Sequence, residues 1–180
     1  MSIALFVLRA LIGGLFIGHG SQKLLGKFGG HGPDGTGQFF ESIGIRPGKP
    51  MALAAGSTEL SGGTLLALGL ATPAAAAGLT SVMCTAAWTL HKPNGPWIDQ
   101  GGYEYTFVTV AALLAVVSGG PGALSLDAAR GRDTWGLGWG LAALAAGAAG
   151  SAAAITAGQS GQESSPTGPQ AQEAASGAAG

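Results

Sequence analysis

The sequence predicts an all-α fold: a polytopic membrane four-helix bundle with a fifth, C-terminal transmembrane helix. Composition is the first reason, because 47% of the 180 residues are hydrophobic and only 9% are charged, whereas a soluble domain carries about 25% charged residues. The second reason is that several stretches approach the roughly 20 apolar residues that a helix needs to cross a bilayer. The third is that clusters of glycine and proline, which disfavour helix interiors, separate those stretches.

The helices of the predicted bundle cover about residues 2–20, 51–70, 73–90 and 103–118. Only Ala71 and Thr72 separate the second helix from the third, and Pro73 suits the first turn of a new helix. These two helices should therefore form a tight hairpin. The run Gly119-Gly120-Pro121-Gly122 ends the fourth helix, because it combines the conformational freedom of glycine with the missing N–H donor of proline.

The fifth predicted helix, residues 135–157, rests on a different pattern. It consists largely of alanine and glycine, which are only marginally favourable in hydrocarbon. Trp135 and Trp139 at its start suit the aromatic belt at a membrane surface. Gly136 and Gly140 have the spacing that lets two helices approach closely. The alternative is an alanine-rich surface helix or a partly ordered tail.

The chain is thus predicted to have three parts: a membrane domain over 1–128, a linker and fifth helix over 129–157, and a disordered tail over 158–180. The tail has no apolar periodicity and cannot bury enough surface to offset the entropy of ordering it. The long connection over residues 21–50 is rich in glycine and contains the adjacent aromatics Phe39-Phe40. This pattern is typical of a short interfacial helix or of a re-entrant cap over the bundle.

Ionisable residues inside the predicted helices are the first candidates for a site, because charges in a membrane are costly and usually pair inside a bundle. Arg9 lies inside the first helix and Glu59 inside the second. Counted from the shared end of these helices, their depths are about 16 and 12 Å. We therefore expect a buried Arg9–Glu59 ion pair, which would either fix the helix register or line a path through the membrane.

A second set of polar residues gathers at the end of the bundle where the longest connection lies. His19 and Lys23 are i, i+4 neighbours on one helix face, and Glu104 begins the fourth helix on the same side. With nearby aromatics they predict a polar mouth that could hold a small anion, a quinone head group or a proton path. The alternatives are that Lys23 extends to the lipid headgroups and that Glu104 stabilises its helix through the helix dipole.

Other kinds of site are not predicted. The one cysteine, Cys84, cannot form an intrachain disulfide, no Cys/His spacing typical of a metal site occurs, and we expect Cys84 to be a packing residue. No glycine pattern has the context for nucleotide binding, and a net charge of -1 argues against nucleic acid as a partner. His31 and His91 fall in predicted loops, where we expect them to be solvated.

Three ordered blocks of sequence within residues 4–128 resemble the DoxX family. The residues that carry the resemblance are Leu8-Arg9, Gly18-His19-Gly20, Lys23-Leu24 and Phe28-Gly29-Gly30 in the first block, Glu59-Leu60-Ser61-Gly62-Gly63 in the second, and Gly101-Gly102-Tyr103-Glu104-Tyr105 with Gly120-Pro121-Gly122 and Leu126-Asp127 in the third. The resemblance implies a four-helix, multi-pass protein of the cell membrane (the inner membrane in a bacterium). The chain from Trp135 onward would then be an addition to the family pattern.

The resemblance also implies a function. It extends distantly to the DoxD subunit of an archaeal thiosulfate:quinone oxidoreductase, and members of the family are tied to redox and oxidative-stress assemblies. We therefore expect a membrane subunit or scaffold of a thiol or sulfur redox system, not a stand-alone enzyme, with the lipid bilayer and a redox protein as partners. No cofactor motif is recognisable, so a partner or a bound quinone would carry the electrons.

A small-molecule or ion permease is the alternative function, with Arg9 and Glu59 lining its path. Permeases usually contain internal repeats and broken helices, and no clear repeat is present in this sequence. The redox subunit is therefore the preferred prediction.

Overall fold

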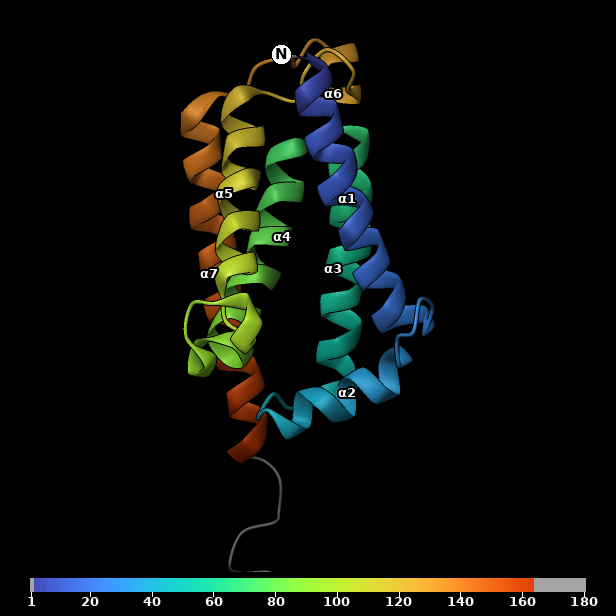
Figure 1. The fold of residues 1–180 in the computed structure, drawn as a ribbon, viewed down its shortest axis with the longest axis vertical. Helices are drawn as coiled ribbons and strands as arrows, with labels where there is room; N and C mark the ends of the chain where they lie inside the picture. The colour runs from blue at the N-terminus through green and yellow to red at the C-terminus, as the bar shows by residue number, and fades with distance from the viewer. Residues whose placement is uncertain (1, 164–180) are drawn as a thin grey trace, which may run out of the picture.

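The protein is an all-α bundle, which confirms the predicted fold class (Figure 1). The structure is a computed structural model that describes residues 2–163, and no strand occurs among them. Its long helices run side by side along the bundle (Figure 1). They are α1 (Ser2–Leu25), α3 (Gly48–Leu68), α4 (Thr72–Ala86), α5 (Glu104–Gly119) and α7 (Gly136–Glu163).

The two ends of the bundle differ in structure. At the end that we call the loop end, α2 (Gly32–Ser42) lies across the bundle (Figure 1). The π-helical turn Ala87–His91 continues α4 toward this end, and the 3-10 turns Lys92–Asn94 and Ile98–Gln100 follow it. The opposite end, which we call the turn end, holds the α3–α4 turn at residues 69–71, the short α6 (Leu126–Ala129) and the start of α7.

The helices occupy the predicted stretches, and the largest differences from the predicted bounds are at the C-terminal ends of α1 and α7. The first helix ends at Leu25 rather than at residue 20, because the backbone leaves the helix at Gly26, where φ is 62°. Gly20 instead packs against α3, where a Cβ added to it would lie 2.6 Å from Leu60 N. Helix α7 continues to Glu163, past the predicted end at residue 157. Residues 164–180 of the predicted tail lie outside the described residues.

The distribution of side chains is that of a membrane bundle, because many large apolar side chains are exposed and several polar ones are buried. The exposed apolar side chains include Ile3, Leu11, Leu15, Val108, Leu137 and Leu141, and the buried polar ones include Arg9, Glu59, Thr72, Thr80, Thr106 and Asp127. Such an apolar exterior fits lipid rather than water. By length and composition, Ile3–Leu25 and Gly136–Ser160 are each apolar enough to cross a membrane, and Glu104–Gly119 is a shorter apolar helix.

The hydrophobic core is concentrated toward the turn end. The side chains that are almost fully buried there are Phe16, Leu66, Leu79, Leu113, Val116 and Val117.

Asp127 of α6 joins three elements beside this core. Its carboxylate accepts hydrogen bonds from the backbone N–H groups of Ala71 and Thr72 at 2.8 and 2.9 Å, from the Thr72 hydroxyl at 2.8 Å and from Trp135 Nε1 at 3.3 Å. The α3–α4 turn and the start of α7 are thereby tied together.

Helices α1 and α3 pack so closely that glycine is required between them. A Cβ at Gly13 would lie 2.5 Å from Gly63 O and 2.8 Å from Ala67 N, which are both backbone atoms. Gly14, the next residue, faces outward, and a Cβ there would meet nothing within 4 Å. The two glycines therefore form a matched pair for testing this packing.

We expect Gly13→Ala to destabilise the bundle by about 1–3 kcal/mol, because the backbone of α3 must move to make room for the methyl group. Gly14→Ala should cause no loss of stability, since alanine favours the helix and meets no neighbour. Thermal unfolding of both variants in the same detergent measures the difference. Equal unfolding temperatures for the two variants would contradict the described α1–α3 packing.

Candidate functional site

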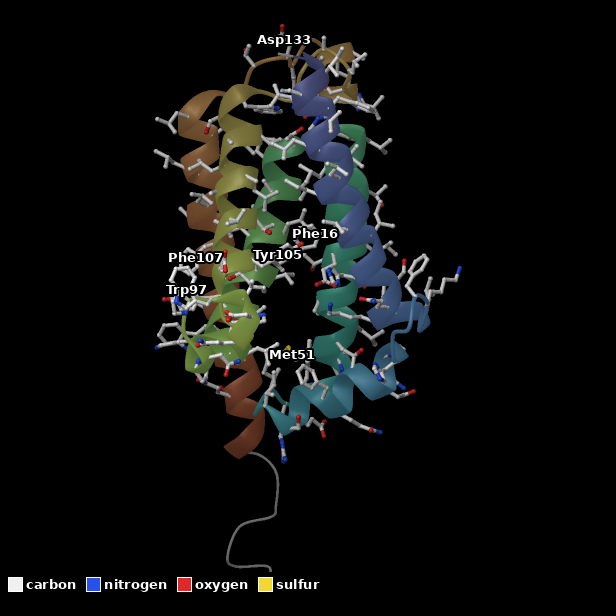
Figure 2. The ribbon with its side chains drawn as sticks, in the orientation of Figure 1. Phe16, Met51, Trp97, Tyr105, Phe107 and Asp133 are labelled. Carbon is white, nitrogen blue, oxygen red and sulfur yellow. The ribbon has the colours of Figure 1, made fainter. Side chains whose placement is uncertain are left out.

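A cavity of about 850 Å³ lies in the loop-end half of the bundle. Helices α1 and α3 form one side of it, α4 and α5 form the other, and α2 lies across its outer end (Figure 1). Figure 2 labels Met51 near α2, Tyr105 on α5, and Phe16 of the core, which lies nearer the turn end than Met51. The walls are mainly apolar, with Phe39, Phe40, Ile43, Ile45, Met51, Ala55, Val82, Met83, Leu90 and Ala154 among the lining residues.

Lys23 and Glu59 form a salt bridge at the inner end of this cavity. Lys23 Nζ lies 2.9 Å from Glu59 Oε1 and 2.7 Å from Oε2. The Glu59 side chain is 3% exposed and that of Lys23 is 21% exposed, so the pair is largely shielded from solvent. One turn further along α3, Gly62 packs against Leu79 of the core. The ion pair therefore lies where the cavity meets the core.

The expected Arg9–Glu59 pair is wrong, because each residue has other partners. Arg9 is fully buried at the turn end. Its Nη1 donates to Leu66 O and Ala67 O, both at 3.1 Å, and its Nη2 donates to Leu124 O at 2.6 Å. Arg9 thus holds the end of α3 to the segment before α6, and it does not line the cavity.

The other predicted residues of the mouth have different environments. His19 lines the cavity, is exposed, and has its Nδ1 3.1 Å from Gln22 Oε1. Glu104 lies at the same end of the bundle but is not among the residues that line the cavity. Its Oε2 accepts a hydrogen bond from the Ile98 N–H at 3.0 Å, which holds the connection before α5. Of the five predicted residues, the structure brings together His19, Lys23 and Glu59.

His31 and His91, for which the sequence predicts solvated loop positions, both line the cavity, and the prediction fails for His91 only. His31 is exposed there, whereas His91 is half-buried at the end of the π-helical turn. His91 Nδ1 lies 2.7 Å from Gly101 O, an atom that can only accept, so Nδ1 carries a proton and Nε2 remains for other partners. The sequence predicts that the third helix ends at residue 90, and the π-helical turn extends α4 to His91.

Helix α7 completes the wall at the outer end of the cavity. Ala154 of α7 lines the cavity. One turn further on, Gly158 O accepts a hydrogen bond from the Arg46 N–H at 2.9 Å, and Gly158 packs against Ile45. These contacts join α7 to the α2–α3 connection and so close the bundle on this side.

The arrangement suits a ligand that is mostly apolar and has one polar end. Lys23 can donate a hydrogen bond and Glu59 can accept one, both at the inner end, while the remaining wall is mainly apolar. Ligand pockets of about 300–1,000 Å³ with a few polar groups among apolar walls are typical of small-molecule sites. Within residues 2–163, no group of three or more His, Cys, Asp or Glu side chains is arranged to hold a metal ion.

Comparison with known proteins adds one finding. A family model described as DoxX matches residues 4–92, which is the part of the chain from α1 to the start of the 3-10 turn at Lys92. Lys23, Glu59 and His91 lie inside the matched segment, whereas α5, α6 and α7 lie outside it. No curated protein and no solved structure matches the chain.

Proposed function

The chain belongs to the DoxX family, and from this we propose that it is a multi-pass protein of the cell membrane that binds a quinone in the loop-end cavity. In this role it is the membrane subunit of a thiol or sulfur redox system. The observation that carries the proposal is the mainly apolar cavity with the Lys23–Glu59 pair at its inner end. The redox assignment itself rests on the resemblance to the family.

The pair can contact both redox forms of a quinone. A quinone carbonyl oxygen accepts hydrogen bonds, so it would bind Lys23 Nζ. A quinol hydroxyl also donates, so it would bind the carboxylate of Glu59. Neither form leaves an uncompensated charge, because Lys23 and Glu59 remain opposite each other. The apolar walls would surround the ring, and the cavity volume is sufficient for a ring of this size.

The cavity also reaches the surface of the bundle where a lipid-soluble molecule could enter. His19 on α1 and Tyr105 on α5 both line the cavity, and both are exposed. Helices α1 and α5 stand apart in the loop-end half (Figure 1). An isoprenoid or alkyl tail could therefore remain in the lipid while the head group occupies the cavity.

Titration of decylubiquinone into the protein in lipid nanodiscs tests the proposal. We expect saturable binding that is about tenfold or more weaker in the double variant Lys23→Gln/Glu59→Gln, because each lost charge-assisted hydrogen bond contributes about 1.5–3 kcal/mol. The double variant leaves no unpaired buried charge, so it should fold. The matched control is Lys49→Gln/Asp34→Asn, which removes an exposed ion pair of 2.7 Å that does not line the cavity.

The result of the titration decides whether the cavity is a quinone site. Binding that is lost in the first double variant and kept in the second supports the quinone site. No saturable binding by the parent protein, or equal binding by all three proteins, would refute it.

Co-purification of a redox protein from native membranes would support the role as a subunit. Transport by the protein alone in liposomes, abolished by Glu59→Gln, would replace the proposal with a permease.

A further inference from the structure

We propose that the cavity is a half-channel for protons, open to water at the loop end alone and ending at the Lys23–Glu59 pair. Protons would then reach the buried carboxylate from one side of the membrane only. Access of water to the ion pair can be tested without any quinone. Its purpose, the supply of protons to a bound quinone, rests on the proposed function.

The turn-end side of the ion pair is closed by packed side chains. Glu59 lies 11 residues into the 21-residue α3, which is about 16 Å from the loop end of that helix. Beyond it, Phe16, Leu66, Leu79 and Leu113 are each at most 1% exposed. Side chains packed in this way leave no space for a file of water molecules.

The loop-end side has a polar track along one wall. Ser81 and Thr85 of α4 and Thr89 of the π-helical turn that continues it are spaced four residues apart, and all three line the cavity. Thr85 Oγ1 donates to Ser81 O and Thr89 Oγ1 donates to Thr85 O, both at 2.8 Å, and Thr85 Oγ1 also lies 3.0 Å from Ser151 Oγ of α7. A hydroxyl oxygen has two acceptor lone pairs, so each of these oxygens can still accept a hydrogen bond from water. The three hydroxyls cover about 12 Å along the helix. Buried water requires such polar partners and sufficient space, and the cavity offers both.

The entrance of this track carries groups that exchange protons. His91 lies beyond Thr89 at the loop end, and its Nε2 is not used by the bond to Gly101 O. Thr106 of α5 and Thr36 of α2 also line the cavity. The titratable groups on the wall are His19, Lys23, His31, Glu59, His91 and Tyr105. Water at the entrance therefore meets several groups that can give or take a proton.

The half-channel would serve the reduction of a bound quinone. Reduction of a quinone to a quinol takes two electrons, here from the thiol or sulfur donor of the proposed system, and two protons. A hydronium ion in the cavity gives its proton to a Glu59 carboxylate oxygen and leaves water, and Glu59 passes the proton to the ligand oxygen. Both protons would come from the loop-end side of the membrane.

Cysteine accessibility in oriented proteoliposomes tests the half-channel. In a Cys84→Ser background, we place single cysteines at Ser81 and Thr89 on the proposed track. The matched control is Thr80→Cys, because Thr80 adjoins Ser81 but is 1% exposed and faces Gly147 of α7. Lys27→Cys marks the loop end and Arg130→Cys marks the turn end, since both are exposed. The probe is a membrane-impermeant cationic methanethiosulfonate, with labelling followed by mass spectrometry.

We expect the Ser81→Cys and Thr89→Cys proteins to be labelled from the same side as Lys27→Cys, at least tenfold faster than Thr80→Cys. Labelling of Ser81→Cys from the side of Arg130→Cys, or equal rates for Ser81→Cys and Thr80→Cys, would overturn the inference. A half-channel without decylubiquinone binding would refute the proposed function and leave this inference standing. Quinone binding with no labelling from the loop end would do the reverse.

Discussion

Replacement of Arg9 by leucine is expected to destabilise the bundle by about 3 kcal/mol or more, because Arg9 makes three hydrogen bonds from a fully buried position. Hydrogen bonds from a charged group contribute about 1.5–3 kcal/mol each, and a buried carbonyl that loses its donor is costly. The leucine variant also removes the cation that attracts the Asp127 carboxylate. Unfolding in mixed detergent micelles, followed by circular dichroism, measures the loss.

Two further variants separate the hydrogen bonds from the charge. Arg9→Lys keeps a positive charge but lacks the planar fork that reaches several carbonyls at once, so an intermediate loss is expected. Arg130→Leu removes an exposed cation at the same end of the bundle and should change stability little. If Arg9→Leu and Arg130→Leu unfolded at the same denaturant concentration, the structural role of Arg9 would be wrong.

Replacement of Asp127 by alanine should cost about 2–4 kcal/mol at neutral pH, because four donors on two other elements lose their acceptor. Burial alone would raise the pKa of the Asp127 carboxyl, but the hydrogen bonds from Thr72, Ala71 and Trp135 outweigh it and hold the pKa below the ordinary value of 3.8. A depressed pKa in the folded state means that the carboxylate stabilises the fold above the ordinary pKa. This stabilisation is lost as the pH falls through the folded-state value.

The difference in stability between the parent protein and Asp127→Ala should therefore be constant near neutral pH and shrink below about pH 4. Unfolding curves at a series of pH values give this difference directly. Asp133→Asn is the control, because Asp133 is an exposed acid at the same end of the bundle (Figure 2). A difference that grows on acidification would mean that the carboxylate is not held in its charged form.

The positions of the helices could be predicted from the sequence because hydropathy and helix-breaking residues are local signals. The α3–α4 turn follows from the short spacing between two apolar stretches, and Gly69 and Ala71 do adopt the left-handed conformation there. The end of α1 could not be predicted in this way. Gly20 has the sequence signature of a helix end, and only the position of α3 shows that it serves close packing.

The partner of Glu59 could not be predicted for the same reason. A first helix that ends at residue 20 places Arg9 at a depth similar to that of Glu59. Because α1 continues to Leu25 and α3 begins at Gly48, Lys23 lies opposite Glu59, and Arg9 lies nearer the turn end. The place of His91 could not be predicted either, since the π-helical turn that carries it into the cavity wall has no signal in local hydropathy.

Helix α7 supplies part of the cavity wall from outside the segment that the family model matches. The ion pair and His91 belong to the segment that the family model matches, whereas Ala154 and Gly158 lie beyond it. A relative that consists of the matched segment alone would lack this side of the cavity and would need another helix, or a neighbouring subunit, to enclose a ligand. Substitutions in α7 can therefore alter which molecules fit without changing the groups that bind their polar end.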